Sequence, residues 1–277
     1  MLIKFDKMQS LGNDFVMIDL MQFPEKPCLD KSFFLSISNR NYGVGCDLTV
    51  LYKFQNSDIF AEFFNSDGSK AEICGNAARC LGFLMKKCND VSKCFLRVDK
   101  RSYPIQVDGK IRVGMGQPSF DPRDVGLSKL SPDVSQLHSE LNLPLDLSIY
   151  YASCVSIGNP HLILFCKNIP EEKKIISVGA QLENHTLFEN RINVSFAQII
   201  SDDEIILSVF ERGVGLTQAC GSGACATVSV ARAQNIISSQ NVLVRQMGGS
   251  LMIHQDKEGN IFQSGPAFYV FSGEMEI

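Results

Sequence analysis

Short apolar or alternating runs bounded by turn residues recur along the whole chain and predict many β-strands. The predicted strands of the first half are 47–54, 59–64, 95–99 and 110–116. Those of the second half are 161–166, 195–200, 204–211 and 241–246. Two longer segments, 75–88 and 221–235, are apolar around most of their circumference and predict buried helices. So few helices among so many strands favour a mixed α/β (α+β) fold, with strands curling around one central helix in each half.

The two halves repeat one another. When the sequence is shifted by 146 positions, without a gap, identical residues align in several separate motifs. The aligned pairs are Gly12–Gly158, Asn13–Asn159, Phe64–Phe210, Cys74–Cys220 and Gly75–Gly221, and Asp47 falls on Asn193. This pattern indicates two homologous halves, roughly 1–120 and 150–265, and the joint between them (117–144) is rich in Pro, Ser and Asp as a linker should be.

Composition narrows the class of protein. The chain has 277 residues, 45% of them hydrophobic, and a formal net charge of −4. These values are typical of a globular protein and do not indicate binding to nucleic acid or to an anionic membrane. No apolar run approaches the roughly 18 residues that span a bilayer, and the first ten residues lack the apolar stretch of a signal peptide. We therefore expect a cytoplasmic protein without nucleic-acid or membrane partners.

The chain has ten cysteines and no C-x-x-C pair. A dense disulfide framework belongs to short secreted chains, so we do not expect one here. A zinc site is not favoured either, because closely spaced ligand pairs are absent and the four histidines are scattered. Most of the cysteines, including Cys80 and Cys225 inside the predicted helices, should be small buried hydrophobic residues. The sequence thus predicts no metal site.

Cys74 and Cys220 differ from the others because each precedes a glycine at the start of a predicted helix. A helix N-terminus carries partial positive charge and unpaired N–H groups, which lower the pKa of a nearby thiol and can hold a carboxylate. Gly75 and Gly221 would let an anion approach the backbone closely. If the halves face each other about a pseudo-twofold axis, one thiol removes a proton from a carbon and the other returns one to the opposite face.

The repeat breaks where titratable groups enter the second half. Asn65 of the first half corresponds to Glu211, and Phe15 corresponds to His161. We hypothesise that His161 and Glu211 set the protonation of the two thiols, one with each, although spacing does not indicate which pairs with which. Amide side chains and an arginine that could grip a second carboxylate would form the polar wall, namely Asn13, Asn65, Asn76, Asn159, Asn193 and Arg212.

Other interpretations of these motifs remain open at this point. The stretch "GSGACA" fits the G-x-G-x-x-A nucleotide fingerprint, but 233–253 lacks the acidic residue that this fingerprint requires. "QACGS" approaches a caspase pattern but has Ser222 at its fifth position. Both cysteines could be plain core residues, His161 a capped loop histidine, and Glu211 and Arg212 a surface pair. A thiol redox protein or a non-catalytic binding module is also open, yet neither accounts for the duplicated thiols.

Six motifs resemble those of the diaminopimelate epimerase family, in the family's order from residue 11 to residue 251. They are "LGNDF", "FFNSDGSKAEICGNAARC", "GNPH", "RIN", "ERGVGLTQACGSGACA" and "GGSL". Proline racemase-like and phenazine-biosynthesis isomerase-like proteins share the fold. The resemblance implies two pseudo-symmetric halves, each a barrel-like sheet rolled around a central helix. Because the last strand of the family returns to the first half, the expected domains are 1–120 plus 265–277, and 121–264.

The resemblance also implies a function, the cofactor-independent epimerisation of LL-diaminopimelate to meso-diaminopimelate for lysine and peptidoglycan precursor synthesis. It implies that Cys74 and Cys220 are the two acid/bases and that His161 and Glu211 assist them. The implied substrate-binding residues are Asn13, Asn65, Asn159, Asn193 and Arg212, with Gly75, Asn76, Gly221 and Ser222 forming the carboxylate cradle. No pyridoxal phosphate is expected, and a homodimer is compatible with the sequence.

Three positions depart from the family pattern. Leu48 stands where the family usually has a glutamine that contacts the substrate, Ala77 replaces a glycine, and Met247 replaces a proline. Leucine cannot form the hydrogen bond that glutamine offers, and a site without such a bond discriminates less strongly. The alternative function is therefore a related cofactor-independent amino-acid racemase of relaxed specificity, acting for example on glutamate.

Overall fold

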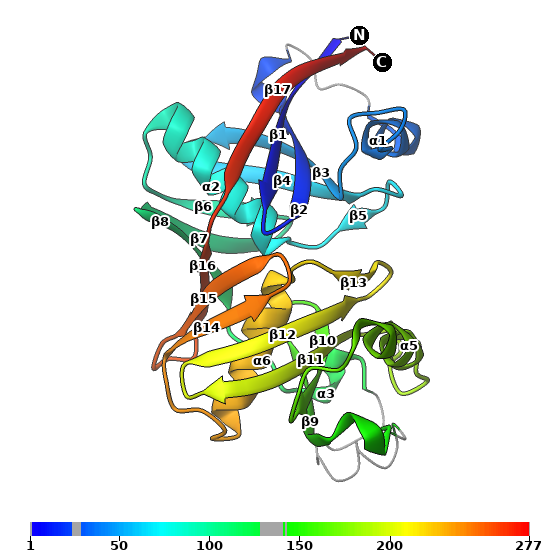
Figure 1. Ribbon diagram of the computed structural model, residues 1–277. Helices are drawn as coiled ribbons and strands as arrows, with labels where there is room; N and C mark the ends of the chain where they lie inside the picture. The colour runs from blue at the N-terminus through cyan, green and yellow to red at the C-terminus, as the bar shows by residue number, and fades with distance from the viewer. Residues whose placement is uncertain (1, 24–28, 128–140, 142, 277) are drawn as a thin grey trace. The chain divides into compact units, whose positions relative to one another are not determined.

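The computed structural model describes residues 2–23, 29–127, 141 and 143–276, and its chain forms two compact units (Figure 1). Unit 1 comprises Met1–Gly114 and Ser264–Ile277, and unit 2 comprises Met115–Gln263. The sequence placed these boundaries at 120/121 and 264/265. Each unit contains its own set of β-strands and more than one α-helix.

The sheet of unit 1 begins with a hairpin of β1 (Leu2–Ser10) and β2 (Asn13–Asp19). Next to β2 lies β3 (Leu48–Gln55), which is parallel to it, and then β4 (Asp58–Asn65), which is antiparallel to β3. The remaining strands are β5 (Lys70–Ala71) and β6 (Lys93–Val98), both paired with β4, followed by β7 (Arg101–Asp108) and β8 (Lys110–Gly116).

The central helix of unit 1 is α2 (Gly75–Asn89), and its residues from Gly75 to Gly82 are all buried. It contacts both β1 and β7. In the order of strand pairing, four strands lie between these two, namely β2, β3, β4 and β6. A flat sheet cannot touch one helix with both of these strands, so the sheet of unit 1 curves around α2. A second helix, α1 (Lys31–Ser38), buries Phe33, Phe34 and Ile37 in a separate apolar cluster with residues of β1, β2 and β3.

Unit 2 repeats this arrangement element by element. A hairpin of β9 (Ile149–Ser156) and β10 (Pro160–Cys166) is followed by β11 (Asn193–Ser201), parallel to β10. β12 (Glu204–Glu211) is antiparallel to β11 and pairs with both β13 (Gly215–Thr217) and the parallel β14 (Asn241–Gln246), as β4 pairs with β5 and β6. β15 (Gly249–Gln255) pairs with β14, and β16 (Ile261–Gly265) ends the repeat. The internal repeat predicted from the sequence is confirmed.

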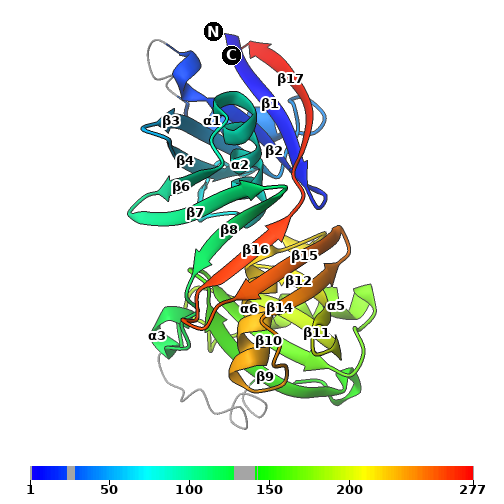
Figure 2. The same ribbon diagram turned by 90° about the vertical axis from the view of Figure 1, so that its left-hand side faces the viewer.

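The central helix of unit 2 is α6 (Gly221–Ala233), which is apolar and buried over most of its surface. It contacts β9, β10 and β11 near one end of the sheet and β15 near the other, so this sheet also curves around its helix. Figure 2 shows α2 and α6 among the strands of their own units. The other α-helices that the structure describes in unit 2 are the short helix α3 (Pro122–Val125) and α5 (Glu172–Glu183). α5 packs against the face of the unit 2 strands that is opposite to α6. The predicted mixed α/β fold with a barrel-like sheet around a central helix is confirmed.

The last strand, β17 (Phe268–Glu276), belongs to unit 1 and runs antiparallel to β1, from Phe268 opposite Gln9 to Glu276 opposite Leu2 (Figure 1). Sequence patterns predicted neither this strand nor β1, β2, β7, β9, β15 and β16. Polar residues within these strands hide the pattern, since Lys7 and Ser10 of β1 are buried and β7 contains Pro104.

Candidate active site

In unit 1, Cys74 occupies the N-terminal capping position of α2. Its backbone is extended, with φ −103° and ψ 114°, and its carbonyl accepts the first helical hydrogen bond, from Ala78 N at 2.8 Å. Gly75 and Asn76 form the first turn of the helix and are buried. The chain therefore places Cys74 beside the unpaired N–H groups of a helix start, as predicted from the sequence.

In unit 1, the side chain of Asn13 contacts this thiol. Cys74 Sγ donates to Asn13 Oδ1 at 3.6 Å, and Asn13 is the first residue of β2. Asn76 is held differently, because its Oδ1 accepts from Arg79 Nη2 at 2.6 Å. Arg79 is fully buried and also donates to Ser10 Oγ at 2.7 Å. Sequence reasoning missed Arg79, although it stands one turn after Asn76 in the same motif.

Asn65, also predicted to bind substrate, ends β4. Its Nδ2 donates to Ser69 Oγ at 2.9 Å across the turn that leads to β5. Leu48 pairs with Asn65 across β3 and β4 and with Phe15 across β2 and β3, and its side chain is buried. An apolar group thus stands directly beside Asn65 in the sheet.

In unit 2, Cys220 occupies the equivalent position at the start of α6, with φ −117° and ψ 112°. Its Sγ accepts from Gly223 N at 3.4 Å and lies 3.5 Å from Ser222 Oγ. Burial raises the pKa of the Cys220 thiol well above its ordinary value, and the nearby Glu211 carboxylate raises it further. The hydrogen bonds from Ser222 and Gly223 lower this pKa but do not outweigh the first two effects.

The sequence-based expectation that the helix start lowers the pKa of this thiol is therefore wrong for Cys220. Its side chain is almost completely buried, which removes the water that would stabilise a thiolate. A helix terminus contributes only a modest favourable field, and a neighbouring carboxylate opposes it. The resting form of Cys220 is the protonated thiol.

Glu211, the last residue of β12, is the carboxylate beside Cys220. Thr217 Oγ1 donates to Glu211 Oε1 at 2.5 Å from the neighbouring strand β13. The sequence left open which thiol Glu211 assists, and the fold of unit 2 places it with Cys220. A carboxylate in contact with a thiol can accept the thiol proton and so produce a nucleophilic, basic thiolate.

His161 lies in β10 and is completely buried. Its Nε2 is 3.1 Å from both Asn159 Oδ1 and Ser222 Oγ. Burial lowers the pKa of His161 to about 3, and the positive charge of Arg212 contributes to this shift. The imidazole is therefore neutral, and because Asn159 Oδ1 can only accept, Nε2 carries the proton. Among the residues that the structure describes, Nδ1 has no hydrogen-bond partner and is therefore a buried, unused hydrogen-bond acceptor.

Ser222 joins several of the predicted site residues of unit 2. Its Oγ accepts from Asn159 Nδ2 at 3.3 Å, in addition to its contacts with His161 and Cys220. Asn193 stands slightly apart, where its Oδ1 accepts from Arg212 N at 2.9 Å and its Nδ2 donates to the Pro160 carbonyl at 2.9 Å. Asn193 thereby ties the start of β11 to the strands on either side.

Gly221 is in close contact with a side chain of β16. A Cβ atom at this position would lie 2.5 Å from Gln263 Oε1. A larger residue would displace the end of the Gln263 side chain, so packing offers a reason for this glycine besides an anion site.

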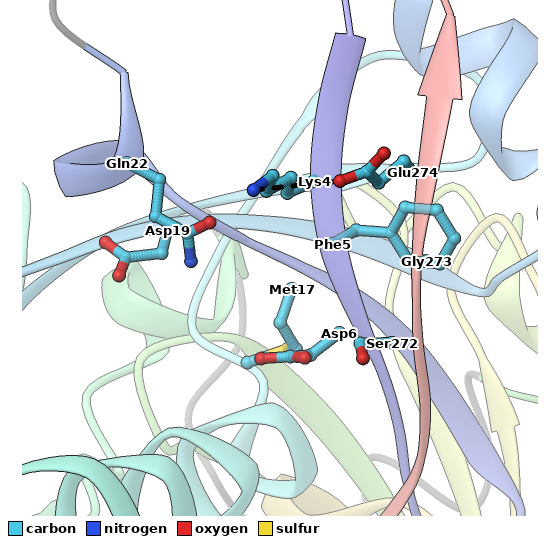
Figure 3. A pocket seen from close by; sticks show the side chains of 9 residues that line it. All are labelled: Lys4, Phe5, Asp6, Met17, Asp19, Gln22, Ser272, Gly273 and Glu274. Carbon is cyan, nitrogen blue, oxygen red and sulfur yellow. Dashed lines mark ion pairs between the residues drawn. The ribbon is translucent and has the colours of Figure 1, made fainter.

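Other kinds of site receive little support. Among the described residues, no group of three or more His, Cys, Asp or Glu side chains is arranged to hold a metal ion. No helix in the described ranges is long and apolar enough to cross a membrane. Unit 1 has a cavity of about 450 Å³, lined by residues of β1, β2, the 3₁₀ turn η1 (Leu20–Gln22) and β17. Figure 3 shows these lining side chains. Its walls include the ion pair of Lys4 and Glu274, at 3.7 Å, and none of the predicted site residues.

Comparison with known proteins agrees with the fold and with the position of these motifs. A sequence model of the family described as diaminopimelate epimerase matches residues 5–120 and 153–270. A diaminopimelate epimerase from Acetivibrio thermocellus is 35% identical over 289 residues, which cover 99% of each chain. One from Gluconobacter oxydans is 38% identical over 277 residues, again covering 99% of each chain.

Solved structures extend the likeness at the level of the fold. A phenazine biosynthesis protein from Enterococcus faecalis matches with a TM-score of 0.68 at 13% identity and covers 100% of both chains. A hydroxyproline epimerase from Agrobacterium vitis matches with a TM-score of 0.67 at 9% identity and covers 99% of this chain and 92% of that one. At such low identity these structures establish the shared fold alone.

Proposed function

Because the chain belongs to the diaminopimelate epimerase family, we propose that it epimerises LL-diaminopimelate to meso-diaminopimelate without a cofactor. It would thus be an isomerase of lysine and peptidoglycan precursor synthesis. The observation that carries the proposal is the pair of repeat-related thiols, Cys74 and Cys220, each capping the central helix of its unit. Inversion at a carbon acid requires an acid/base for each face of the carbon, and the repeat supplies one thiol in each unit.

The proposed reaction moves protons only. Glu211 accepts the proton of Cys220, and the resulting thiolate removes the α-proton of one stereoisomer. Cys74, whose thiol faces Asn13, donates a proton to the opposite face of the same carbon. The other direction uses the same groups in the opposite order. Because Glu211 lies beside Cys220, His161 is proposed to set the protonation of the other thiol, Cys74.

The remaining predicted residues are proposed to hold the substrate. The N–H groups at the helix starts, with Gly75, Asn76, Gly221 and Ser222, suit the carboxylate next to the reacting carbon. Asn13, Asn65, Asn159, Asn193 and Arg212 suit the distal amino and carboxylate groups. Transfer of solvent deuterium to the inverted carbon during epimerisation tests the proposal.

A cytoplasmic location and a homodimeric assembly are proposed as well. A net charge of −4 gives no support to nucleic-acid binding. Phe268, Val270 and Phe271 of β17 are each about half exposed, which supports a homodimer that covers this strand. Light scattering would give the mass in solution, and a monomer at micromolar concentration would contradict the homodimer.

Leu48 favours a second candidate function, slow racemisation of other amino acids with a distal carboxylate. Its buried leucine side chain next to Asn65 offers no hydrogen bond to a substrate amide or amine. We expect the protein to convert L-glutamate to D-glutamate slowly, and we expect Leu48→Gln to reduce this activity relative to that on diaminopimelate. Chiral chromatography measures both rates, with Cys220→Ala as the blank. Absence of D-glutamate above that blank would rule the second function out.

A further inference from the structure

Four charged side chains of unit 1 lie behind Asn13 and have no part in the proposed reaction. They form a charge cluster of Lys7, Asp14, Arg40 and Asp47. Arg40 donates from Nη1 to Asp14 Oδ2 at 3.0 Å and from Nη2 to Asp14 Oδ1 at 2.8 Å. Lys7 Nζ, on a side chain only 10% exposed, donates to Asp14 Oδ2 at 2.6 Å. Two cations therefore hold Asp14, and although burial raises its pKa, their hydrogen bonds lower it to about 2.

Asp47 connects this charge cluster to the thiol. Its Oδ1 accepts from Arg40 Nη2 at 2.7 Å, and its Oδ2 accepts from Asn13 Nδ2 at 2.8 Å and from Asp14 N at 3.1 Å. Its own backbone N–H donates to Asp14 Oδ1 at 3.0 Å. Both carboxylate oxygens are thus committed, and one of them fixes the amide nitrogen of Asn13.

This contact decides which way the Asn13 amide points. A carboxylate accepts hydrogen bonds, so the NH₂ group of Asn13 must face Asp47 and its Oδ1 must face the other way. Asn13 Oδ1 is the atom that accepts from Cys74 Sγ. An acceptor facing a thiol favours the protonated form over the thiolate. The charge cluster therefore reaches Cys74 through a single amide.

Unit 2 lacks this arrangement. At the 146-residue shift, Asn159 corresponds to Asn13, while Pro160 and Asn193 correspond to Asp14 and Asp47. Asn159 contacts Ser222 and His161, and Asn193 is neutral and bound to the Pro160 carbonyl. The thiol of Cys220 accepts from the N–H of Gly223. The repeat has therefore kept the two cysteines but has surrounded them differently.

We propose that Asp47, held by Arg40 and Asp14, is a positioning residue that locks the Asn13 amide with its carbonyl toward Cys74 and so keeps Cys74 protonated before reaction. The inference rests on the proposed function for its catalytic meaning. It assigns to unit 1 the thiol that is ready to donate a proton. It also gives the charge cluster a function, although its side chains do not contact the substrate.

Asp47→Asn tests the inference, because an amide at this position accepts or donates equally well and no longer dictates the orientation of Asn13. We expect kcat for diaminopimelate to fall about tenfold or more, as the loss of a charged hydrogen bond predicts, with KM changed much less. We also expect iodoacetamide to alkylate Cys74 about fivefold faster at fixed pH, since one neutral hydrogen bond to the thiol is lost. Peptide mass spectrometry separates Cys74 from the other cysteines.

A double-mutant cycle separates positioning from a general charge effect. In an Asn13→Ala background, Asp47→Asn should accelerate alkylation of Cys74 no further, because Asp47 acts through Asn13. Full additivity of the two changes would overturn the inference, as would Asp47→Asn with unchanged kcat and unchanged alkylation. Asp58→Asn removes another ion pair of unit 1, with Arg97 at 2.9 Å, and should alter neither readout.

Two further arrangements keep the test decisive. If Asp47→Asn does not fold, Arg40→Gln replaces it, since the Arg40 side chain is 58% exposed and its loss should shift both readouts in the same direction. Unchanged readouts in a folded Arg40→Gln protein would then overturn the inference. An inactive wild-type protein would contradict the proposed function. Alkylation needs no turnover, so the difference in Cys74 alkylation rate between the wild type and Asp47→Asn would still test the positioning of Asn13.

Discussion

Replacing either Cys74 or Cys220 with alanine should abolish epimerisation, because each variant lacks the acid/base on one face of the carbon. General acid–base groups contribute about 10²–10⁴-fold, so each single variant should lose at least that much in kcat. The expected measurement is the conversion of LL-diaminopimelate to meso-diaminopimelate by chiral chromatography, with circular dichroism to verify the fold.

A matched control lies in α2, the helix that Cys74 caps. Cys88 is an exposed free thiol near the end of α2, so Cys88→Ala should leave kcat unchanged. Normal turnover by Cys74→Ala or by Cys220→Ala would show that one base is enough, and the two-thiol account would have to be abandoned.

Glu211→Gln should lower kcat roughly 10²-fold, at the lower end of what a general base contributes, because glutamine cannot accept the thiol proton of Cys220. Glutamine has the same shape and can still accept from Thr217, so the fold of β12 and β13 should persist. Burial and then the Glu211 charge raise the pKa of Cys220. Removing the charge therefore lowers this pKa, and iodoacetamide should alkylate Cys220 faster in the variant even though turnover is slower.

Opposite changes in reactivity and turnover distinguish proton acceptance from a structural role. A merely structural Glu211 would reduce turnover without raising the alkylation rate of Cys220. Glu204→Gln on the same strand, which removes an ion pair with Arg245, should change neither quantity. A Glu211→Gln protein with kcat close to that of the wild type would refute the role given to Glu211.

The parts of the fold that the sequence predicted are those that repeat. The shift of 146 positions and the two buried helices after Cys74 and Cys220 define both units, and the structure has the same strand pairings twice. Strands with buried polar residues, such as β1 with Lys7, could not be recognised by hydrophobicity. The burial of Lys7 is stable because Asp14 neutralises it, a contact between two strands that no local pattern reveals.

The sequence predicts the candidate site as a set of residues and not as an arrangement. The pairing of Glu211 with Cys220 depends on the β12–β13 turn, which brings the end of one strand to the start of α6. The direction of the Cys220 pKa depends on burial, which a helix-start motif cannot report. Neither Arg79 beneath Asn76 nor Asp47 behind Asn13 has a signal of its own in the sequence, because each acts through contacts with another residue.

The most direct test of the two-thiol account is epimerisation of LL-diaminopimelate in deuterated water, stopped at low conversion. A thiol carries a single proton, so the base should return substrate-derived protium to its own face while the opposite thiol delivers deuterium from solvent. The meso product should therefore carry one deuterium at the inverted carbon, and the recovered LL substrate should carry almost none. A meso product that retains the original protium would contradict the account, because a single base would then have served both faces.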